Sequence, residues 1–218
     1  MTYQELAKSM FDIYLNMDKC GDLVELPDKM LLDIDDNNNG IFWNIPKTPC
    51  LILYKNREEV SNFCKLLLVQ LFNQMSPILI QINYMDGQRL GADLSDFFDM
   101  PENVLKFTNS SDVNEVLNSK LDELQSRLKS VGSFTISEYN KEMLKNDSVL
   151  LTYNILMLMD IDFNVLKSQN ITSLMLSGTK VGILPYIFIN EEDFLEDKSL
   201  REHMLKTLLN ITLVVLAL

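Results

Sequence analysis

Basic residues are scarce in this chain, and their scarcity limits what it can bind. The 218 residues include 19 lysines and arginines against 31 aspartates and glutamates, which gives a formal net charge of −12 at pH 7. A chain this acidic is a poor candidate for sequence-independent binding to the phosphate backbone of a nucleic acid. We therefore expect no direct binding of nucleic acid.

Histidine, cysteine and long apolar runs are scarce too. His203 is the single histidine, so a catalytic triad or a His-rich metal site would have to use it. The cysteines, Cys20, Cys50 and Cys64, form no C-x-x-C pair, and their odd number fits reduced thiols in a reducing compartment. No apolar run approaches the roughly 18 residues of a membrane-spanning helix, and no signal peptide is recognisable. We predict a cytoplasmic protein with no metal site and no direct membrane insertion.

Apolar periodicity divides the chain into a short N-terminal part and one α/β domain. Apolar residues at three- and four-residue steps predict a helix within residues 1–22. Short apolar pieces around an Asn-Gly pair predict a hairpin at about residues 23–48, with a solvated loop as the alternative. We interpret residues 23–218 as a single domain.

Beyond Pro49, continuously apolar strands alternate with helices, a rhythm typical of a parallel sheet covered by helices on both faces. Strands are predicted at residues 50–54, 78–84, 104–107, 149–159, 183–189 and 211–218. Helices are predicted at about residues 60–75, 112–130, 138–144, 165–176 and 191–209. The fold class is therefore α/β with three layers. Because the last apolar strand runs to the final residue, we expect a domain cut from a longer protein.

Ligands of parallel α/β sheets bind beyond the carboxyl ends of the strands, so the residues at these ends form the candidate site. The segment Lys55–Asn62 lies where a phosphate-binding loop would be. Such a loop needs glycines for backbone contact with phosphate and a lysine for its charge. This chain has no glycine between Gly40 and Gly87, and Glu58 and Glu59 add negative charge. The segment is either a lost nucleotide site or an ordinary strand–turn–helix connection.

Two further strand ends carry polar residues. Asp160, Ile161 and Asp162 follow an apolar strand, as an acidic magnesium ligand does, although acids are common at strand ends. Asn190 follows the next strand along the chain. We interpret the pair Asp86-Gly87 as a turn.

The order of these segments resembles the motor domain of the FtsK/SpoIIIE family, the ring-forming DNA translocases and their relatives in type VII secretion. Residues 49–72 follow the family's strand, nucleotide loop and helix without a gap, and residues 76–86 resemble its next strand. Further resemblances lie at residues 100–103, 121–140, 153–166, 182–190 and 209–218. The resemblance implies a RecA-like, P-loop NTPase-type fold over roughly residues 23–218.

The same resemblance implies that the family's ATPase residues are replaced. The nucleotide loop falls on Lys55, Asn56, Arg57, Glu58, Glu59, Val60, Ser61 and Asn62. None of these is a glycine, and Ser61 and Asn62 stand where the family has lysine and serine. The family lysine stabilises charge on the transferring phosphate, and its loss removes that stabilisation.

The Walker B segment is degraded in the same way. Asp160 matches the family aspartate, but Ile161 replaces the catalytic glutamate, and Asp162 is one residue out of register. Asn190 stands where the family has a glutamine. Losing the glutamate removes the group that positions water. Because an unpaired, partly buried carboxylate is costly, we expect a basic side chain of the loop to lie near Asp160.

These replacements imply a catalytically degenerate, pseudo-ATPase domain with no bound cofactor. Its role would be structural or interactive, with other motor-type ATPase domains, a protein partner or a second copy of itself, in a DNA translocase or a secretion motor. The alternative is an active ATP-dependent DNA translocase or secretion ATPase with an atypical nucleotide loop. A third hypothesis is a solitary binding protein with a generic α/β fold.

Overall fold

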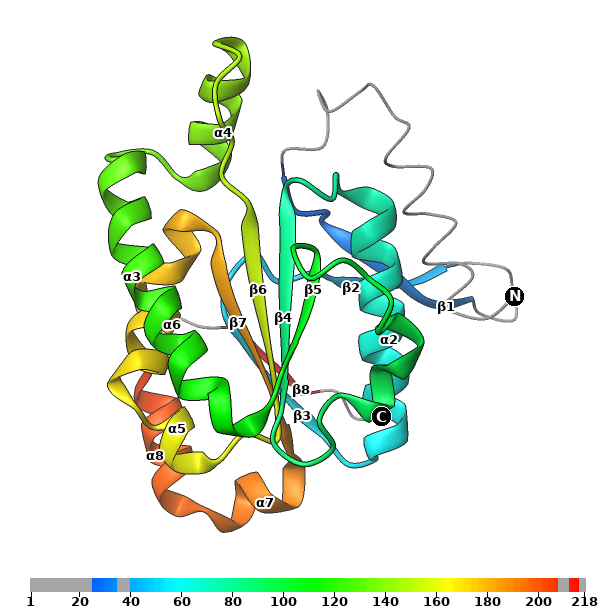
Figure 1. Cartoon of the computed structure of the whole chain (residues 1–218). Helices are drawn as coiled ribbons and strands as arrows, with labels where there is room; N and C mark the ends of the chain where they lie inside the picture. The colour runs from blue at the N-terminus through cyan, green and yellow to red at the C-terminus, as the bar shows by residue number, and fades with distance from the viewer. Residues whose placement is uncertain (1–24, 35–39, 208–211, 216–218) are drawn as a thin grey trace.

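The computed structural model describes residues 25–34, 40–207 and 212–215. These residues form a three-layer α/β domain around a six-stranded sheet with the strand order β5-β4-β6-β7-β3-β8 (Figure 1). Every pair of neighbouring strands in this sheet is parallel. The fold class predicted from the sequence is confirmed.

The strands of the sheet are β3 (Cys50–Tyr54), β4 (Ile80–Asp86), β5 (Leu105–Thr108), β6 (Tyr153–Met159), β7 (Ile183–Asn190) and β8 (Thr212–Val215). The α-helices are α2 (Arg57–Gln74), α3 (Val113–Val131), α4 (Ile136–Lys145), α5 (Phe163–Leu166), α6 (Gln169–Val181), α7 (Glu191–Glu196) and α8 (Lys198–Thr207). Two 3-10 helices, η1 (Ala92–Phe97) and η2 (Ser110–Asp112), flank β5 in the chain.

Helices cover both faces of the sheet, and each face has its own apolar core. Figure 1 shows α2 on one face and α3 and α6 on the other. Because successive residues of a strand point to opposite faces, Ile52 of β3 packs into the core beneath α2, and Leu51 packs into the core beneath α3 and α6. Strands buried on both faces are continuously apolar, which is why their positions are visible in the sequence.

An antiparallel pair of strands packs against α2, where the sequence predicts a hairpin. β1 (Lys29–Ile34) pairs with β2 (Gly40–Asn44). The side-chain amide of Gln70 on α2 accepts from the Leu31 N–H and donates to the Leu31 carbonyl, both at 2.7 Å. The Trp43 and Phe63 rings meet edge to face, with centroids 5.1 Å apart. The predicted Asn-Gly turn begins in residues 35–39, and the N-terminal helix falls in residues 1–22; both lie outside the described residues.

The helix boundaries differ from the prediction where polar side chains cap the backbone. The predicted helix at 191–209 is two helices, because the Asp197 carboxylate accepts from the Leu200 N–H at 2.8 Å and starts α8. The predicted helix at 165–176 is likewise divided into α5 and α6, where Ser168 caps α6. In the part of the chain that the structure describes, no helix has the length and apolar character to span a bilayer.

Candidate functional site at the carboxyl ends of the strands

The connection between β3 and α2 is a tight turn. Only Lys55 and Asn56 separate the last residue of β3 from Arg57, the first residue of α2. The Asn56 side chain accepts from the Glu58 N–H at 2.9 Å, and Glu58 and Glu59 place their charges in the first turn, where the helix dipole favours anions. The sequence predicted that α2 starts near residue 60, but this cap starts it three residues earlier.

Most of the predicted nucleotide loop is therefore helix. Ser61 donates to the Arg57 carbonyl at 2.7 Å, Val60 is buried in the core, and Asn62 is exposed on the helix surface. A phosphate-binding loop needs several irregular residues whose N–H groups converge on the phosphate. The geometry here is that of an ordinary strand–turn–helix connection.

The Arg57 guanidinium lies among three carboxylates. It donates to Asp160 Oδ2 at 2.5 Å, to Asp86 Oδ2 at 2.6 Å and, through Nε, to Asp93 Oδ2 at 2.7 Å. The Tyr54 hydroxyl donates to the same Asp160 oxygen at 2.5 Å. We call these five residues the Arg57 cluster. The expected basic side chain beside Asp160 is present, and it is Arg57.

The cluster is nearly closed to solvent. The side chain of Arg57 is 13% exposed, that of Asp160 is 5% exposed and that of Asp86 is fully buried. An arginine suits this position because its planar, permanently charged fork can serve several carboxylates at once.

Neighbouring strands bring the carboxylates together. Asp86 ends β4 in register with Met159 of β6, and the Gly87 N–H donates to the Met159 carbonyl at 2.9 Å. A Cβ atom on Gly87 would lie 2.0 Å from the Asp160 carbonyl oxygen, so this close approach requires glycine. Asp86 also accepts from the N–H groups of Gln88 at 2.9 Å and Arg89 at 3.0 Å.

The sequence missed three members of this cluster. The pair Asp86-Gly87 was interpreted as a turn, which is correct locally, but Asp86 also binds Arg57. Tyr54 is the last residue of the predicted strand 50–54, and this place at a strand end is the signal that points to it, although no site role was predicted for its hydroxyl. Asp93 belongs to η1, and nothing in the sequence pattern links it to the strand ends.

The remaining predicted site residues have local structural roles. Ile161 is 3% exposed and packs into the core beneath α3 and α6. Asp162 caps α5 by accepting from the Asn164 N–H at 2.7 Å. Asn190 caps α7 and donates to the Lys55 carbonyl at 3.5 Å. None of these three contacts the Arg57 cluster through a described hydrogen bond.

Burial and ion pairing compete in setting the protonation of the cluster. Burial raises the pKa of Asp160 above its usual range, and this outweighs the hydrogen bonds from Tyr54 and Arg57. Burial also raises the pKa of Tyr54. For Asp93, burial is outweighed by the hydrogen bonds of two arginines, so its pKa is lowered. Burial alone would lower the pKa of Arg57, but its carboxylate partners raise it, so the guanidinium stays charged.

The residues present do not fit a magnesium-bound nucleoside triphosphate. Asp160 Oδ2 already accepts from both Tyr54 and Arg57, so this oxygen is not open to a magnesium ion. The turn at Lys55 and Asn56 has no glycine, and the first turn of α2 carries two glutamates.

Sequence comparison finds no match: no protein-family model matches the chain, and no curated protein sequence is significantly similar. Comparison of folds does find matches. EssC (ATPases 2 and 3) from Geobacillus thermodenitrificans aligns with a TM-score of 0.55 and 11% identity, over 87% of this chain and 37% of that one. The cytoplasmic domain of the Thermomonospora curvata type VII secretion ATPase EccC aligns with a TM-score of 0.53 and 10% identity, over 88% of this chain and 22% of that one.

The chain has the fold of the EssC and EccC ATPase domains. The cytoplasmic domain of EssC gives the same result, with a TM-score of 0.52 and 13% identity over 89% of this chain and 37% of that one. The order of short sequence segments along the chain indicates a resemblance to type VII secretion ATPases. This resemblance is confirmed at the level of the fold. The chain spans between 22% and 37% of the length of these EssC and EccC chains.

Proposed function

We propose that this domain is a pseudo-ATPase, an EssC- and EccC-like domain whose nucleotide site has become a structural ion-pair cluster. One observation carries the proposal: the Arg57 guanidinium lies against Asp160, the residue that matches the Walker B aspartate. The cation that balances this carboxylate belongs to the chain itself. The vestigial site comprises the segment Lys55–Asn62, the segment Asp160–Asp162 and Asn190.

The electrostatics of the cluster support this proposal. Three carboxylates, Asp86, Asp93 and Asp160, are paired with Arg57, and Arg89 adds a second cation 3.0 Å from Asp93. Even when Arg89 is counted with the cluster, three negative charges against two positive charges leave a net negative charge. A triphosphate that approached this end of the sheet would meet like charge, and displacing Arg57 would leave buried carboxylates unpaired.

We infer a structural or interaction role in a multidomain motor, which this chemistry supports. The EccC and EssC structures comprise ATPases 2 and 3 of those proteins. We propose that this domain packs against other motor-type ATPase domains in the cytoplasm, in the same assembly or as a homo-oligomer. The net charge of −12 favours a protein partner over nucleic acid. We propose that the assembly is a secretion motor or a DNA translocase.

Calorimetric titration with ATP and magnesium tests the proposal. We expect no saturable binding at millimolar nucleotide and no ATPase activity. The alternative, an active ATPase, predicts tight, magnesium-dependent binding that Asp160→Asn weakens. That pattern would contradict the pseudo-ATPase proposal, because it would show that Asp160 serves a metal ion and that Arg57 can be displaced.

A further inference from the structure

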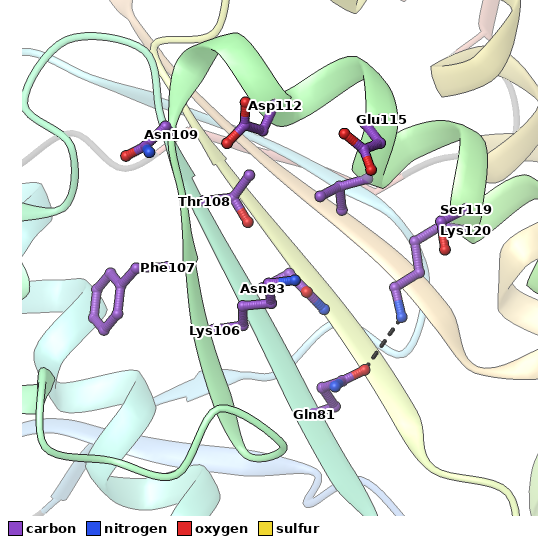
Figure 2. Close-up of a pocket in the computed structure, with 11 residues that line it drawn as sticks. Gln81, Asn83, Lys106, Phe107, Thr108, Asn109, Asp112, Glu115, Ser119 and Lys120 are labelled. Carbon is purple, nitrogen blue, oxygen red and sulfur yellow. Dashed lines mark hydrogen bonds between the residues drawn. The ribbon is translucent and has the colours of Figure 1, made fainter.

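A polar cleft lies on the sheet face that carries α3, and it shares no residue with the Arg57 cluster (Figure 2). Its volume is about 370 Å³, at the small end of the range for ligand pockets. The buried part of its lining is polar and comes from three elements: Asn83 of β4, Thr108 of β5 and Lys120 of α3. This is unusual, because a parallel sheet normally presents apolar side chains to the helices that cover it.

Two buried polar atoms in this cleft have no hydrogen-bond partner. Asn83 is 2% exposed and Thr108 is 7% exposed, yet neither Asn83 Nδ2 nor Thr108 Oγ1 is bonded to any described residue. Both residues line the cleft. Buried polar groups in folded proteins are nearly always paired, so an unpaired donor in a residue that lines a cleft favours an acceptor supplied by a ligand.

The lysine beside them is held in place by the protein. Lys120 Nζ donates to Asn154 at 2.9 Å, to Glu123 at 2.8 Å and to Gln81 at 3.2 Å, the last of these shown in Figure 2. Asn154 in turn donates to Glu123 at 3.1 Å. The wall of the cleft is therefore preorganised, which lowers the entropic cost of binding a ligand.

Charges of opposite sign line different parts of the cleft. Lys106 of β5 is in register with Asn83 and lines the cleft beside it. Asp112 at the end of η2 and Glu115 of α3 line the part where α3 begins, and Figure 2 shows both apart from Asn83. An amide N–H and an ammonium group at one part suit a carboxylate, whereas the two carboxylates at the other part suit an ammonium group.

We propose that this cleft binds a small zwitterion of the size of a free amino acid. The carboxylate of the ligand accepts from Asn83 Nδ2 and pairs with Lys106. The Thr108 hydroxyl donates to the same carboxylate, and the ammonium group of the ligand faces Asp112 and Glu115. This proposal is independent of the pseudo-ATPase proposal, because none of these residues takes part in the Arg57 cluster.

Thermal unfolding of the full chain with each of the proteinogenic L-amino acids tests the inference. We expect at least one of them, at millimolar concentration, to raise the melting temperature by about 2–5 °C through preferential binding to the folded state. The Asn83→Leu variant should lose this ligand-induced shift, and Thr108→Val should weaken it. Lys129→Met is the matched control, since Lys129 is exposed on α3 and does not line the cleft.

A second measurement keeps the test decisive if Asn83→Leu folds poorly. The side-chain amide signals of Asn83 in an ¹⁵N-labelled protein should move on titration with the amino acid that stabilises it, and saturate. The inference is overturned if no amino acid stabilises the chain or moves these signals. It is also overturned if acetate or inorganic phosphate alone reproduces the full shift, or if the shift persists in Asn83→Leu.

Discussion

At the scale of single residues, two cations near the start of α2 lie in opposite environments. Arg57 is the first residue of the helix and is buried among carboxylates, whereas the Lys55 side chain is 64% exposed and pairs with Glu191 at 3.5 Å. The sequence predicts a basic partner for Asp160 but does not choose between the two. The choice depends on where α2 begins, and the Asn56 cap sets that boundary.

Replacing Arg57 tests how much the cluster contributes to stability. Arg57→Met should lower the free energy of unfolding by about 3–5 kcal/mol, because it leaves Asp86 and Asp160 without their cation and Asp93 with Arg89 alone. Lys55→Met, the matched control, removes only an exposed ion pair and should cost less than about 1 kcal/mol. Urea unfolding of both variants measures the difference. Equal, small effects would show that the cluster is not a structural element.

The pH dependence of the same variant has a definite sign. In the wild type, ion pairing lowers the pKa of Asp93. Its contribution to stability is therefore present above the pKa of the unfolded chain, about 3.9, and is lost as pH falls through the lower pKa of the folded state. In Arg57→Met, loss of the guanidinium raises the pKa of Asp93 and raises that of Asp160 further, so stability is lost as pH rises through these pKa values. The cost of the substitution should therefore grow between about pH 3 and pH 6. Unfolding curves across this range check it, and a pH-independent cost would contradict it.

At the scale of elements, α3 is fixed to the sheet by charged residues as well as apolar ones. Lys120 and Arg127 are only 8% and 6% exposed. In the sequence they stand among acidic residues, a pattern typical of a solvent-exposed helix face. Arg127 donates to the carbonyls of Thr152 at 2.5 Å and Val181 at 2.9 Å and pairs with Glu123 at 2.6 Å. Thr152 and Val181 come from distant parts of the chain, so helical periodicity does not reveal these two contacts.

Arg127 should therefore matter more than its position in the sequence suggests. Arg127→Met should destabilise the fold by about 2–4 kcal/mol, because two carbonyls lose the Arg127 donor and Glu123 loses one of its two cations. Lys129→Met, on the exposed side of the same helix, should change stability by less than about 0.5 kcal/mol. Chemical denaturation compares the two variants. If both substitutions are neutral, the contacts of Arg127 do not fix α3 to the sheet.

At the scale of the whole molecule, the sequence predicts the layers of the fold but not all of the site. The strands β3, β6 and β7 follow from continuous apolar runs, although β6 begins at Tyr153 and the predicted run 149–152 lies outside it. Asn140 binds the backbone of Leu151 at both its N–H and its carbonyl, at 2.8 Å each, before the strand begins. The cluster needs the strand order as well, which places β6 beside β4 and so brings Asp160 to Asp86.

The charge of the whole chain makes a prediction about nucleic acid. The net charge is −12, and burial removes Lys120 and Arg127 from any basic stripe on α3. We expect no retention of duplex DNA at physiological salt, because too few exposed cations are available to release counterions. A gel mobility shift at submicromolar protein, abolished by higher salt, would contradict this expectation.

Arg57 is part of the chain, and this distinguishes it from a bound ligand. A nucleotide is exchanged at every turnover, so a motor domain alternates between loaded and empty forms whose balance follows the supply of ATP. The cation beside Asp160 is tethered a few residues from β3 and never leaves by diffusion. On the proposed function, the domain keeps one conformation at every ATP-to-ADP ratio. It would serve a rotating or pulling assembly as its stationary part, against which the cycling neighbours do work.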